Sequence, residues 1–262
     1  MRWHGQKRQV PAGSQRDKAD IRLNSTLDSE QVPGATTLRL IEDVLDRGAT
    51  HVALLMRHSA REFATGKHDL LNPLTDEGRE LARQLGARLP AELLIRGYSS
   101  PAERCVETGD LILEGHAGKG GKVTRNRPAE ALGVFYILDQ IRMYMVMQAA
   151  GGQVPMLEKW FHGEVGLDTM MPPDLAARMV AGFAASKLDD RLAESQLDLL
   201  VSHDMTLFTV RDRLLGQKAA DVGGVNFLDG IAVYRLDGEL LIQSHHGGPV
   251  PLAILFETSS GS

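Results

Sequence analysis

The chain has 262 residues, of which 43% are hydrophobic and 24% charged, the balance of a soluble globular protein long enough to bury a core. Its 29 Lys and Arg against 34 Asp and Glu give a net charge of −5, which argues against a protein that coats nucleic acid or an anionic membrane. The single cysteine, Cys105, excludes an intrachain disulfide and a cysteine-based zinc site.

The first 35 residues are polar, mix Gly, Pro, Gln and charges, and show no apolar period. We therefore expect a flexible tail over residues 1–35 and a single folded domain over residues 36–262. The tail lacks the apolar core of a secretory signal, and no stretch of the chain approaches the ~18 apolar residues of a membrane helix. These features predict a cytoplasmic protein.

The first elements follow from apolar spacing. Helical spacing over residues 37–45 is followed by a short apolar run over 51–56, which is typical of a buried strand in a parallel sheet. Thr75 is predicted to cap a helix whose leucines recur every four residues up to residue 89. A second strand is expected over 93–98.

A strong helix-start pattern follows this strand. Ser100 is a cap residue, Pro101 fits the first helical position, and Glu103 stands three residues after the cap. The pattern predicts a helix from Ser100 to Glu114. The Gly and Lys residues of 115–122 predict a surface loop, which does not match a phosphate loop because a glycine stands where that pattern needs lysine.

Strands continue to alternate with helices in the second half of the chain. The expected elements are helices over 137–149, 172–188 and 204–215, a strand over 197–201, and a hairpin over 231–244 that turns at Asp237-Gly238. This alternation predicts an α/β fold: three layers, α/β/α, around a mostly parallel central sheet. The helices of roughly 115–195 are expected to form a lid over the substrate.

Three polar segments follow directly after three of the predicted strands. Taken singly, each also fits a surface loop or a helix cap. Because the carboxyl ends of strands in an open α/β sheet line the ligand crevice, we expect the segments to meet in space. Together they supply three arginines, two histidines and a carboxylate: Arg57, His58, Arg61, Arg104, His203 and Asp204.

This combination of side chains suits phosphoryl transfer. The planar fork of arginine matches phosphate oxygens, and neutral imidazole is a competent nucleophile near pH 7. Arginines around an imidazole favour its neutral form and stabilise the charge that spreads over the phosphoryl oxygens during transfer. The reaction then requires no metal, and the sequence shows no metal-ligand cluster, so we predict neither a metal nor another cofactor.

The three segments resemble the histidine phosphatase superfamily, also called phosphoglycerate mutase-like. The leading Arg-His-Gly motif of that family stands here as Arg57-His58-Ser59, with Arg61 three residues after the histidine. The segment SSPAERCVETG resembles the family's Ser-Ser-Pro-x-x-Arg region, and SHDMTL resembles its second conserved histidine with the following helix. The resemblance runs in order over roughly residues 50–236.

The resemblance implies a role for each residue. His58 attacks phosphorus and becomes a phosphohistidine, while the phosphoryl oxygens are held by Arg57, Arg61, Arg104 and His203. A carboxylic acid protonates the leaving group and then activates water. One branch of the family uses the Asp after the second His, here Asp204, and the other uses a Glu that Glu130 in RPAEALGVF matches. Both remain candidates, with Asp204 preferred.

Two positions depart from the family pattern. Ser59 replaces the usual Gly, which would strain the chain if the position needs a positive φ, although the hydroxyl could instead touch phosphate. Gly109 stands where the family often has Ala, which we interpret as a difference in packing.

The sequence therefore predicts a metal-independent phosphatase for a small phosphomonoester. A phosphoglycerate-type mutase is the alternative enzyme, but the first motif continues with Ala60 and Arg61 where mutases usually have Glu-Ser and an Asn. The other alternative is a non-catalytic phosphate-binding or interaction module on the same fold, against which the intact set of Arg and His residues argues. The sequence indicates neither the particular substrate nor an oligomeric state.

Overall fold

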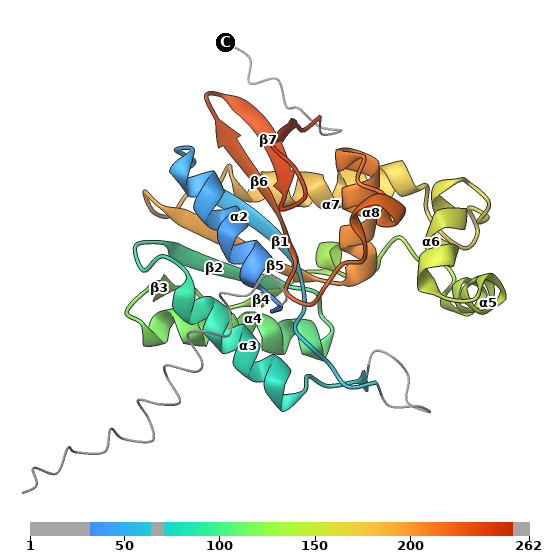
Figure 1. Ribbon diagram of the computed structural model, residues 1–262, viewed down its shortest axis with the longest axis horizontal. Coiled ribbons are helices and arrows are strands. Elements are labelled where there is room, and N and C mark those ends of the chain that lie inside the picture. The colour runs from blue at the N-terminus through green and yellow to red at the C-terminus, as the bar shows by residue number, and fades with distance from the viewer. Residues whose placement is uncertain (1–31, 64–70, 254–262) are drawn as a thin grey trace, which may run out of the picture.

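Figure 1 shows the computed structural model of the chain, which describes residues 32–63 and 71–253. A single sheet forms its centre, with the strand order β3-β2-β5-β1-β6-β7-β8 and β4 paired to β2. The strands are β1 (His51–Arg57), β2 (Leu94–Ser99), β3 (Lys122–Val123), β4 (Arg127–Pro128), β5 (Gln196–Ser202), β6 (Gly230–Leu236), β7 (Glu239–Ser244) and β8 (Val250–Pro251). The tail predicted over 1–35 lies almost wholly outside the described residues.

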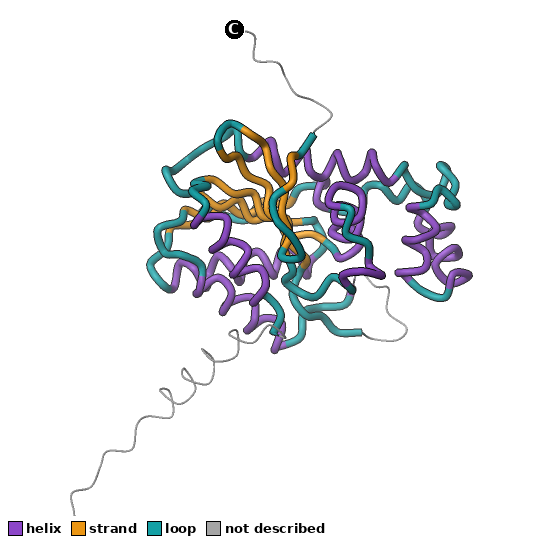
Figure 2. The backbone as a smooth tube through the Cα atoms, turned by 45° about the horizontal axis from the view of Figure 1, so that its top comes forward, coloured by secondary structure: helices purple, strands orange, loops and turns teal. Residues whose placement is uncertain are grey.

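The helices are α2 (Ala35–Asp46), α3 (Asp76–Arg88), α4 (Glu103–Gly118), the short 3₁₀ helix η2 (Glu130–Leu132), α5 (Gln140–Ala150), α6 (Gln153–Phe161), α7 (Pro173–Lys187), α8 (Asp204–Leu215) and α9 (Ala219–Val222). Helices α2, α3 and α4 cover one face of the sheet and α7 and α8 cover the other, so the predicted three-layer α/β/α fold is confirmed (Figures 1 and 2). In the described ranges, none of these helices has the length and apolar character needed to cross a bilayer.

The sheet brings distant segments of the chain to one edge. Strands β2, β5 and β1 are parallel neighbours, whereas β6, β7 and β8 are antiparallel. The register pairs Arg57 at the end of β1 with Ser202 at the end of β5, and Ser99 at the end of β2 with Val201. The residues that follow these three strands therefore emerge side by side, as the sequence predicts.

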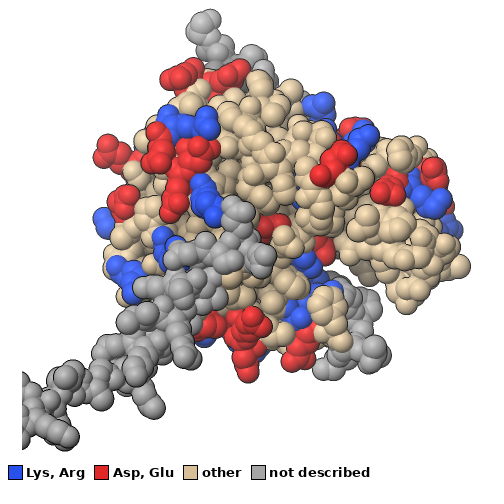
Figure 3. All heavy atoms as spheres, in the orientation of Figure 1, with Lys and Arg blue, Asp and Glu red and all other residues tan. Residues whose placement is uncertain are grey.

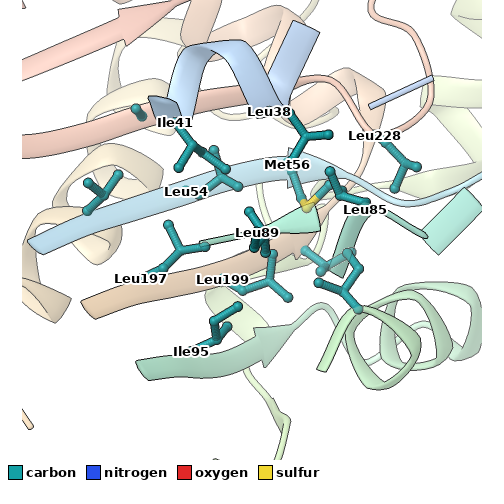
Figure 4. Close-up of a cluster of buried hydrophobic side chains, with 14 of the residues drawn as sticks. Leu38, Ile41, Leu54, Met56, Leu85, Leu89, Ile95, Leu197, Leu199 and Leu228 are labelled. Atoms are coloured by element: carbon teal, nitrogen blue, oxygen red, sulfur yellow. The ribbon is translucent and has the colours of Figure 1, made fainter. Parts of the chain in front are cut away.

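Each face of the sheet buries its own hydrophobic cluster. Successive side chains of a strand point to opposite faces, so Leu54 and Met56 of β1 join one cluster while Ala53 and Leu55 join the other. Figure 4 shows the first cluster, where Leu54 and Met56 lie among side chains of α2 and α3. This packing on both faces fixes the register of β1, because a one-residue slip would exchange the two sets.

The helix predicted to begin at Ser100 begins instead at Glu103, with Ala102 in the N-cap position, and it continues past Glu114 to Gly118. The prediction was wrong because Ser100 still belongs to the edge of the sheet: its backbone N–H donates to Val201 O at 2.8 Å. Its hydroxyl lies between the second histidine and the start of the helix: it contacts His203 Nε2 at 2.9 Å and accepts from the Ala102 backbone N–H at 3.4 Å. The loop expected over 115–122 is correspondingly shorter.

The range expected to form a lid contains two kinds of helix. α7 belongs to the layer over the sheet, since its small side chains are buried and it contacts β1 and β6. α5 and α6 stand to one side of the layers (Figure 2). The sequence does not predict α6, because Gly152 and Pro155 interrupt the apolar pattern. Pro155 lies in the first turn of α6, where a missing N–H leaves no helical hydrogen bond unmade.

Glycines allow α3 and α4 to cross closely. A Cβ atom added at Gly86 would lie 1.9 Å from Ile112 O. We expect Gly86→Ala to lower the free energy of unfolding by about 3 kcal/mol, because the backbones must separate. The control is Gly182→Ala in α7, where no atom lies within 4 Å and the added methyl should stabilise the helix by about 0.5–1 kcal/mol. Urea unfolding measures both, and equal effects at the two positions would contradict the crossing.

Candidate active site

His58, Arg104 and His203 meet at the carboxyl edge of β1, β2 and β5. Arg104 Nε donates to His58 Nε2 at 3.0 Å, and Arg104 Nη2 donates to His203 Nδ1 at 3.3 Å. The two imidazole rings lie 5.8 Å apart in an edge-on arrangement, and all three side chains are nearly buried. The structure thus joins one residue from each of the three segments that the sequence singled out.

The contacts of His58 determine where its proton lies. A guanidinium can only donate, so His58 Nε2 must accept from Arg104 and carry the lone pair. The proton then resides on Nδ1, which donates to Ser59 O at 2.8 Å. Burial, followed by the charge of Arg104, holds the pKa of His58 well below its usual value of 6.5. The ring is therefore neutral at neutral pH, and a neutral imidazole can act as a nucleophile.

His203 is oriented by a second set of contacts. Because its Nδ1 accepts from Arg104, its Nε2 carries the proton and donates to Ser100 Oγ at 2.9 Å. The thiol of Cys105 lies 3.8 Å from His203 Nε2, but burial raises the pKa of that thiol to about 12. Cys105 consequently packs in the site as a neutral thiol.

Arg57 lies beside His58, and its two terminal nitrogens bind different partners. Nη1 donates to Val225 O at 2.7 Å, and Nη2 forms an ion pair with Asp204 Oδ2 at 3.0 Å. Nε is buried and makes no hydrogen bond within the described residues. Burial lowers the pKa of Arg57, yet the group keeps its proton as arginines do. Arg57 therefore brings a positive charge to the site beside His58, with one buried N–H left unpaired among the described residues.

Asp204 is the first residue of α8, and each of its carboxylate oxygens accepts from neighbouring donors. Oδ1 accepts from the Met205 backbone N–H at 2.7 Å and from Gln153 Nε2 at 3.1 Å. Oδ2 is held by Arg57. The carboxylate acts here as an acceptor that orients Arg57, and the contact with Gln153 ties the first residue of α6 to the site.

Glu130 occupies the same edge of the sheet but in a different setting. It opens η2 just after β4, and that turn is fixed at Leu132, whose O accepts from Ser202 Oγ at 2.7 Å. The Glu130 side chain is exposed, and in the part of the chain that the structure describes it forms no hydrogen bond or ion pair. The structure therefore places Glu130 on the rim without bringing it into contact with His58.

Arg61 is further along the loop after β1. Its Nη1 donates to Glu62 O at 3.2 Å, and its guanidinium lies 4.3 Å from the centre of the Phe63 ring. The positive charge of Arg61 is one of the causes that lower the pKa of Arg57. Arg61 is thus near Arg57, on the side of the site where an anion would gain from both charges.

The two departures from the family pattern have structural explanations. Ser59 does not have a positive φ, and its hydroxyl donates to Gly78 O at 2.7 Å, so neither strain nor a phosphate contact accounts for it. The idea of a phosphate contact was wrong because this side chain points toward α3. At Gly109, a Cβ atom would lie 2.7 Å from Asn126 Nδ2, which donates to Val106 O. The missing side chain makes room for that bond.

Sequence reasoning missed several residues of the site. The sequence predicts Ser100 only as a helix cap, although Ser100 stands in the Ser-Ser-Pro segment that resembles the family. Phe227 lies with its ring centre 6.0 Å from that of His58 and 4.0 Å from the Arg57 guanidinium carbon. It belongs to an irregular segment, which has no period to detect. Gln153 opens the helix that the sequence did not predict.

The described surface has neither a large patch of one charge in the view of Figure 3 nor a cluster of metal-ligand side chains. Figure 3 shows acidic and basic side chains interspersed over the face in view, with no large region of one sign. Within residues 32–63 and 71–253, His, Cys, Asp and Glu side chains form no group of three that could hold a metal ion. The described site thus presents cationic and imidazole groups rather than a ligand cage.

Comparison with models of protein families matches residues 53–239 to the histidine phosphatase superfamily (branch 1). Among solved structures, phosphoglycerate mutase from Bacillus anthracis str. Sterne is 19% identical, with 76% of this chain and 94% of that chain covered and a TM-score of 0.50. YhfR from Bacillus stearothermophilus is 20% identical, with coverages of 74% and 96% and a TM-score of 0.50. At these identities the structures show a shared fold. No curated protein matches the chain.

Proposed function

Because the chain belongs to the histidine phosphatase superfamily, we propose that it is a metal-independent phosphomonoester hydrolase with His58 as its nucleophile. The observation that carries this proposal is the state of His58: neutral, with its lone pair on Nε2 and surrounded by Arg57, Arg104 and His203. Such a group can attack phosphorus while the neighbouring cations stabilise the charge on the phosphoryl oxygens.

The first step forms a bond from His58 Nε2 to phosphorus and breaks the bond from phosphorus to the ester oxygen. The phosphoryl oxygens are held by the guanidinium groups of Arg57 and Arg104, with the charge of Arg61 nearby. His203 contributes its Nε2–H, which donates to Ser100 Oγ before the ligand binds. The leaving oxygen takes a proton from a carboxylic acid, so the alcohol departs neutral. The product on the protein is a phosphohistidine.

The second step returns His58 to its resting state. A water molecule gives a proton to the same carboxylate and attacks phosphorus, while the bond to His58 Nε2 breaks. Inorganic phosphate then leaves, and His58 recovers the lone pair that accepts from Arg104. The carboxyl group thus serves as acid in the first step and as base in the second.

The contacts favour Glu130 over Asp204 for this carboxyl group. Both oxygens of Asp204 already accept hydrogen bonds, and one of them holds Arg57 in place. The exposed Glu130 side chain is free to exchange protons with solvent between steps. We therefore assign proton transfer to Glu130 and the orientation of Arg57 to Asp204, which reverses the preference drawn from the sequence.

Leaving-group chemistry tests this assignment. Para-nitrophenolate is a stable anion and departs without being protonated. An alkyl leaving group must be protonated as it departs, because an alkoxide is a poor leaving group. We expect Glu130→Gln to lower kcat for an alkyl phosphate by about 10²–10³-fold but to change hydrolysis of para-nitrophenyl phosphate little. Asp204→Asn should raise KM for both substrates, because Arg57 loses its partner. Steady-state kinetics on both esters measures the effects, and a leaving-group dependence confined to Asp204→Asn would reverse the roles.

The substrate we propose is a small phosphomonoester. Gln153, the first residue of α6, reaches Asp204 beside Arg57, so the start of α6, which packs against α5, borders the site. Helices in this position limit the size of the group that can follow the phosphate into the site.

The function is tested by hydrolysis of para-nitrophenyl phosphate in excess EDTA, with acid-free denaturation and intact mass to trap the phosphoenzyme. We expect EDTA-resistant turnover and a protein that gains one phosphoryl group in an acid-labile linkage. Phosphate binding without turnover on any phosphomonoester would support the non-catalytic module instead. Turnover that EDTA abolishes would contradict a metal-independent reaction.

A further inference from the structure

The segment between α9 and β6, residues 223–229, is attached to the site by two arginines. Arg211 Nη2 donates to Gly223 O at 2.5 Å, and Arg211 Nη1 donates to Gly224 O at 3.0 Å. The next carbonyl, that of Val225, accepts from Arg57 Nη1 at 2.7 Å. Three successive carbonyls of an irregular segment are thus held by guanidinium groups, and one of these groups belongs to the candidate active site. We call residues 223–229 the arginine-held loop.

The other end of the arginine-held loop is fixed at Asp229. Its Oδ2 accepts from the Asn226 backbone N–H at 2.6 Å, and its Oδ1 accepts from Thr36 Oγ1 at 3.1 Å. Its backbone O accepts from the Arg57 N–H at 2.9 Å. The loop is therefore bound to Arg57 at two points, one through the side chain and one through the main chain.

The arginine-held loop carries Phe227 into the site. The Phe227 ring lies under the guanidinium of Arg57 and beside the ring of His58. A cation over an aromatic face is attracted to it, so Phe227 restrains the plane of Arg57. Any displacement of the loop would move both a hydrogen-bond partner and a stacking partner of Arg57.

Arg211 is unusual for a buried cation. The residue is only 3% exposed, and within the described residues it forms no ion pair; its N–H groups bind the two carbonyls and contact His246 Nε2 at 3.3 Å. Asp229 and Asp212 act on Arg211 through their charges but without an ion-pair contact, and burial of a cation that lacks a direct carboxylate partner generally lowers stability. A group of this kind is better explained by the geometry it imposes on the loop than by a contribution to folding.

We propose that Arg211 is a positioning residue, which holds the arginine-held loop against Arg57 and thereby fixes the phosphate-binding geometry of the site. Arg211 itself does not touch the ligand, and it acts through Gly223, Gly224 and Val225 on Arg57. The inference rests on the proposed function in one respect, namely that the ligand of Arg57 is a phosphoryl group.

The test compares Arg211→Met and Arg211→Lys with Arg213→Met. Arg213 lies on the same helix but pairs with Asp174 and Asp212, and none of its recorded contacts involves the loop. We expect Arg211→Met to raise both the Kd of inorganic phosphate and the KM of para-nitrophenyl phosphate about tenfold. Arg211→Lys should lie between Arg211→Met and the native protein, and Arg213→Met should match the native protein. Calorimetric titration with inorganic phosphate gives the Kd.

A purely structural role would give a different pattern. Arg211→Met would then lower the Tm and the active fraction, and hence the apparent kcat, while Kd and KM stayed unchanged; that result would overturn the proposal. If Arg211→Met does not fold, Arg211→Lys decides in the same way. A second test uses Arg57→Met: once Arg57 is removed, Arg211→Met should raise the phosphate Kd no further, and two independent, additive losses would contradict the coupling.

The phosphate Kd also separates this inference from the proposed function, because it needs no turnover. A protein without phosphatase activity whose phosphate affinity falls on Arg211→Met would refute the function and support the positioning role. Normal hydrolysis with unchanged Kd and KM in Arg211→Met would support the function and refute the positioning role. A native protein that does not bind phosphate would refute both.

Discussion

The change His58→Ala is expected to reduce the hydrolysis of para-nitrophenyl phosphate by on the order of 10⁴-fold or more, because none of the neighbouring groups that the structure describes can replace the nucleophile. His203 Nε2 carries a proton that it donates to Ser100, and the lone pair of its Nδ1 faces Arg104. Cys105 is the other nucleophilic atom in the cluster, but burial keeps it a thiol by raising its pKa to about 12.

The measurement is the rate in excess EDTA together with the yield of trapped phosphoenzyme. We expect His58→Ala to lose both while its affinity for inorganic phosphate persists, since the arginines remain. The matched control is His162→Ala at the exposed end of α6, which should retain the native rate. A His58→Ala protein that folds and still hydrolyses the ester would show that the nucleophile has been assigned wrongly.

The change Arg104→Met is expected to have two effects, because Arg104 contacts both histidines. Removing a preorganised donor from the phosphoryl oxygens should lower kcat/KM by about 10²–10³-fold. Removing its charge should also raise the pKa of His58, since the charge of Arg104 is the second cause, after burial, of the low value. Burial remains, so the pKa should stay below 6.5.

The direction of the pH effect follows from the need for neutral His58. In the native protein the low pKa keeps the imidazole neutral well below pH 6.5, so the acid limb of kcat/KM should lie below that value. In Arg104→Met the ring becomes protonated at a higher pH, and the acid limb should move up. The pH profile and an NMR titration of the His58 ring measure this shift.

The control for this experiment is Arg83→Met on the exposed surface of α3, where the guanidinium pairs with Glu114. Its pH profile should match that of the native protein. An unchanged acid limb in Arg104→Met would show that the charge of Arg104 does not set the protonation of His58, and the account of the nucleophile would then depend on burial alone.

The chain order of the elements was predictable because the signals are local. Apolar spacing identifies β1, β5 and most of the helices, and the rule that parallel strands end at one edge places His58, Arg104 and His203 together. Turn chemistry at Asp237-Gly238 gives the hairpin of β6 and β7 in the same way. Both predictions use only local sequence and require no information about contacts between distant residues.

Other features depend on contacts that no local pattern contains. Ser100 has the sequence of a helix cap, but its backbone hydrogen bond to Val201 holds it at the end of β2, where its hydroxyl contacts His203. Ser59 takes the place of a glycine, yet its partner, Gly78, decides that it points away from the site. In both cases local preference is outweighed by a neighbour that only folding supplies.

The fold class and the three segments that build the site can be predicted from consecutive residues, because hydrophobic periodicity and the ends of strands are local features of the chain. Three features depend instead on contacts between distant residues: the proton position on His58, the hydrogen bonds to both Asp204 oxygens, and the link from Arg211 through the arginine-held loop to Arg57. Arg57 and Val225 are separated by 168 positions and joined by a backbone carbonyl. Every residue type has a backbone carbonyl, so the sequence does not show that Val225 is the residue whose carbonyl binds Arg57.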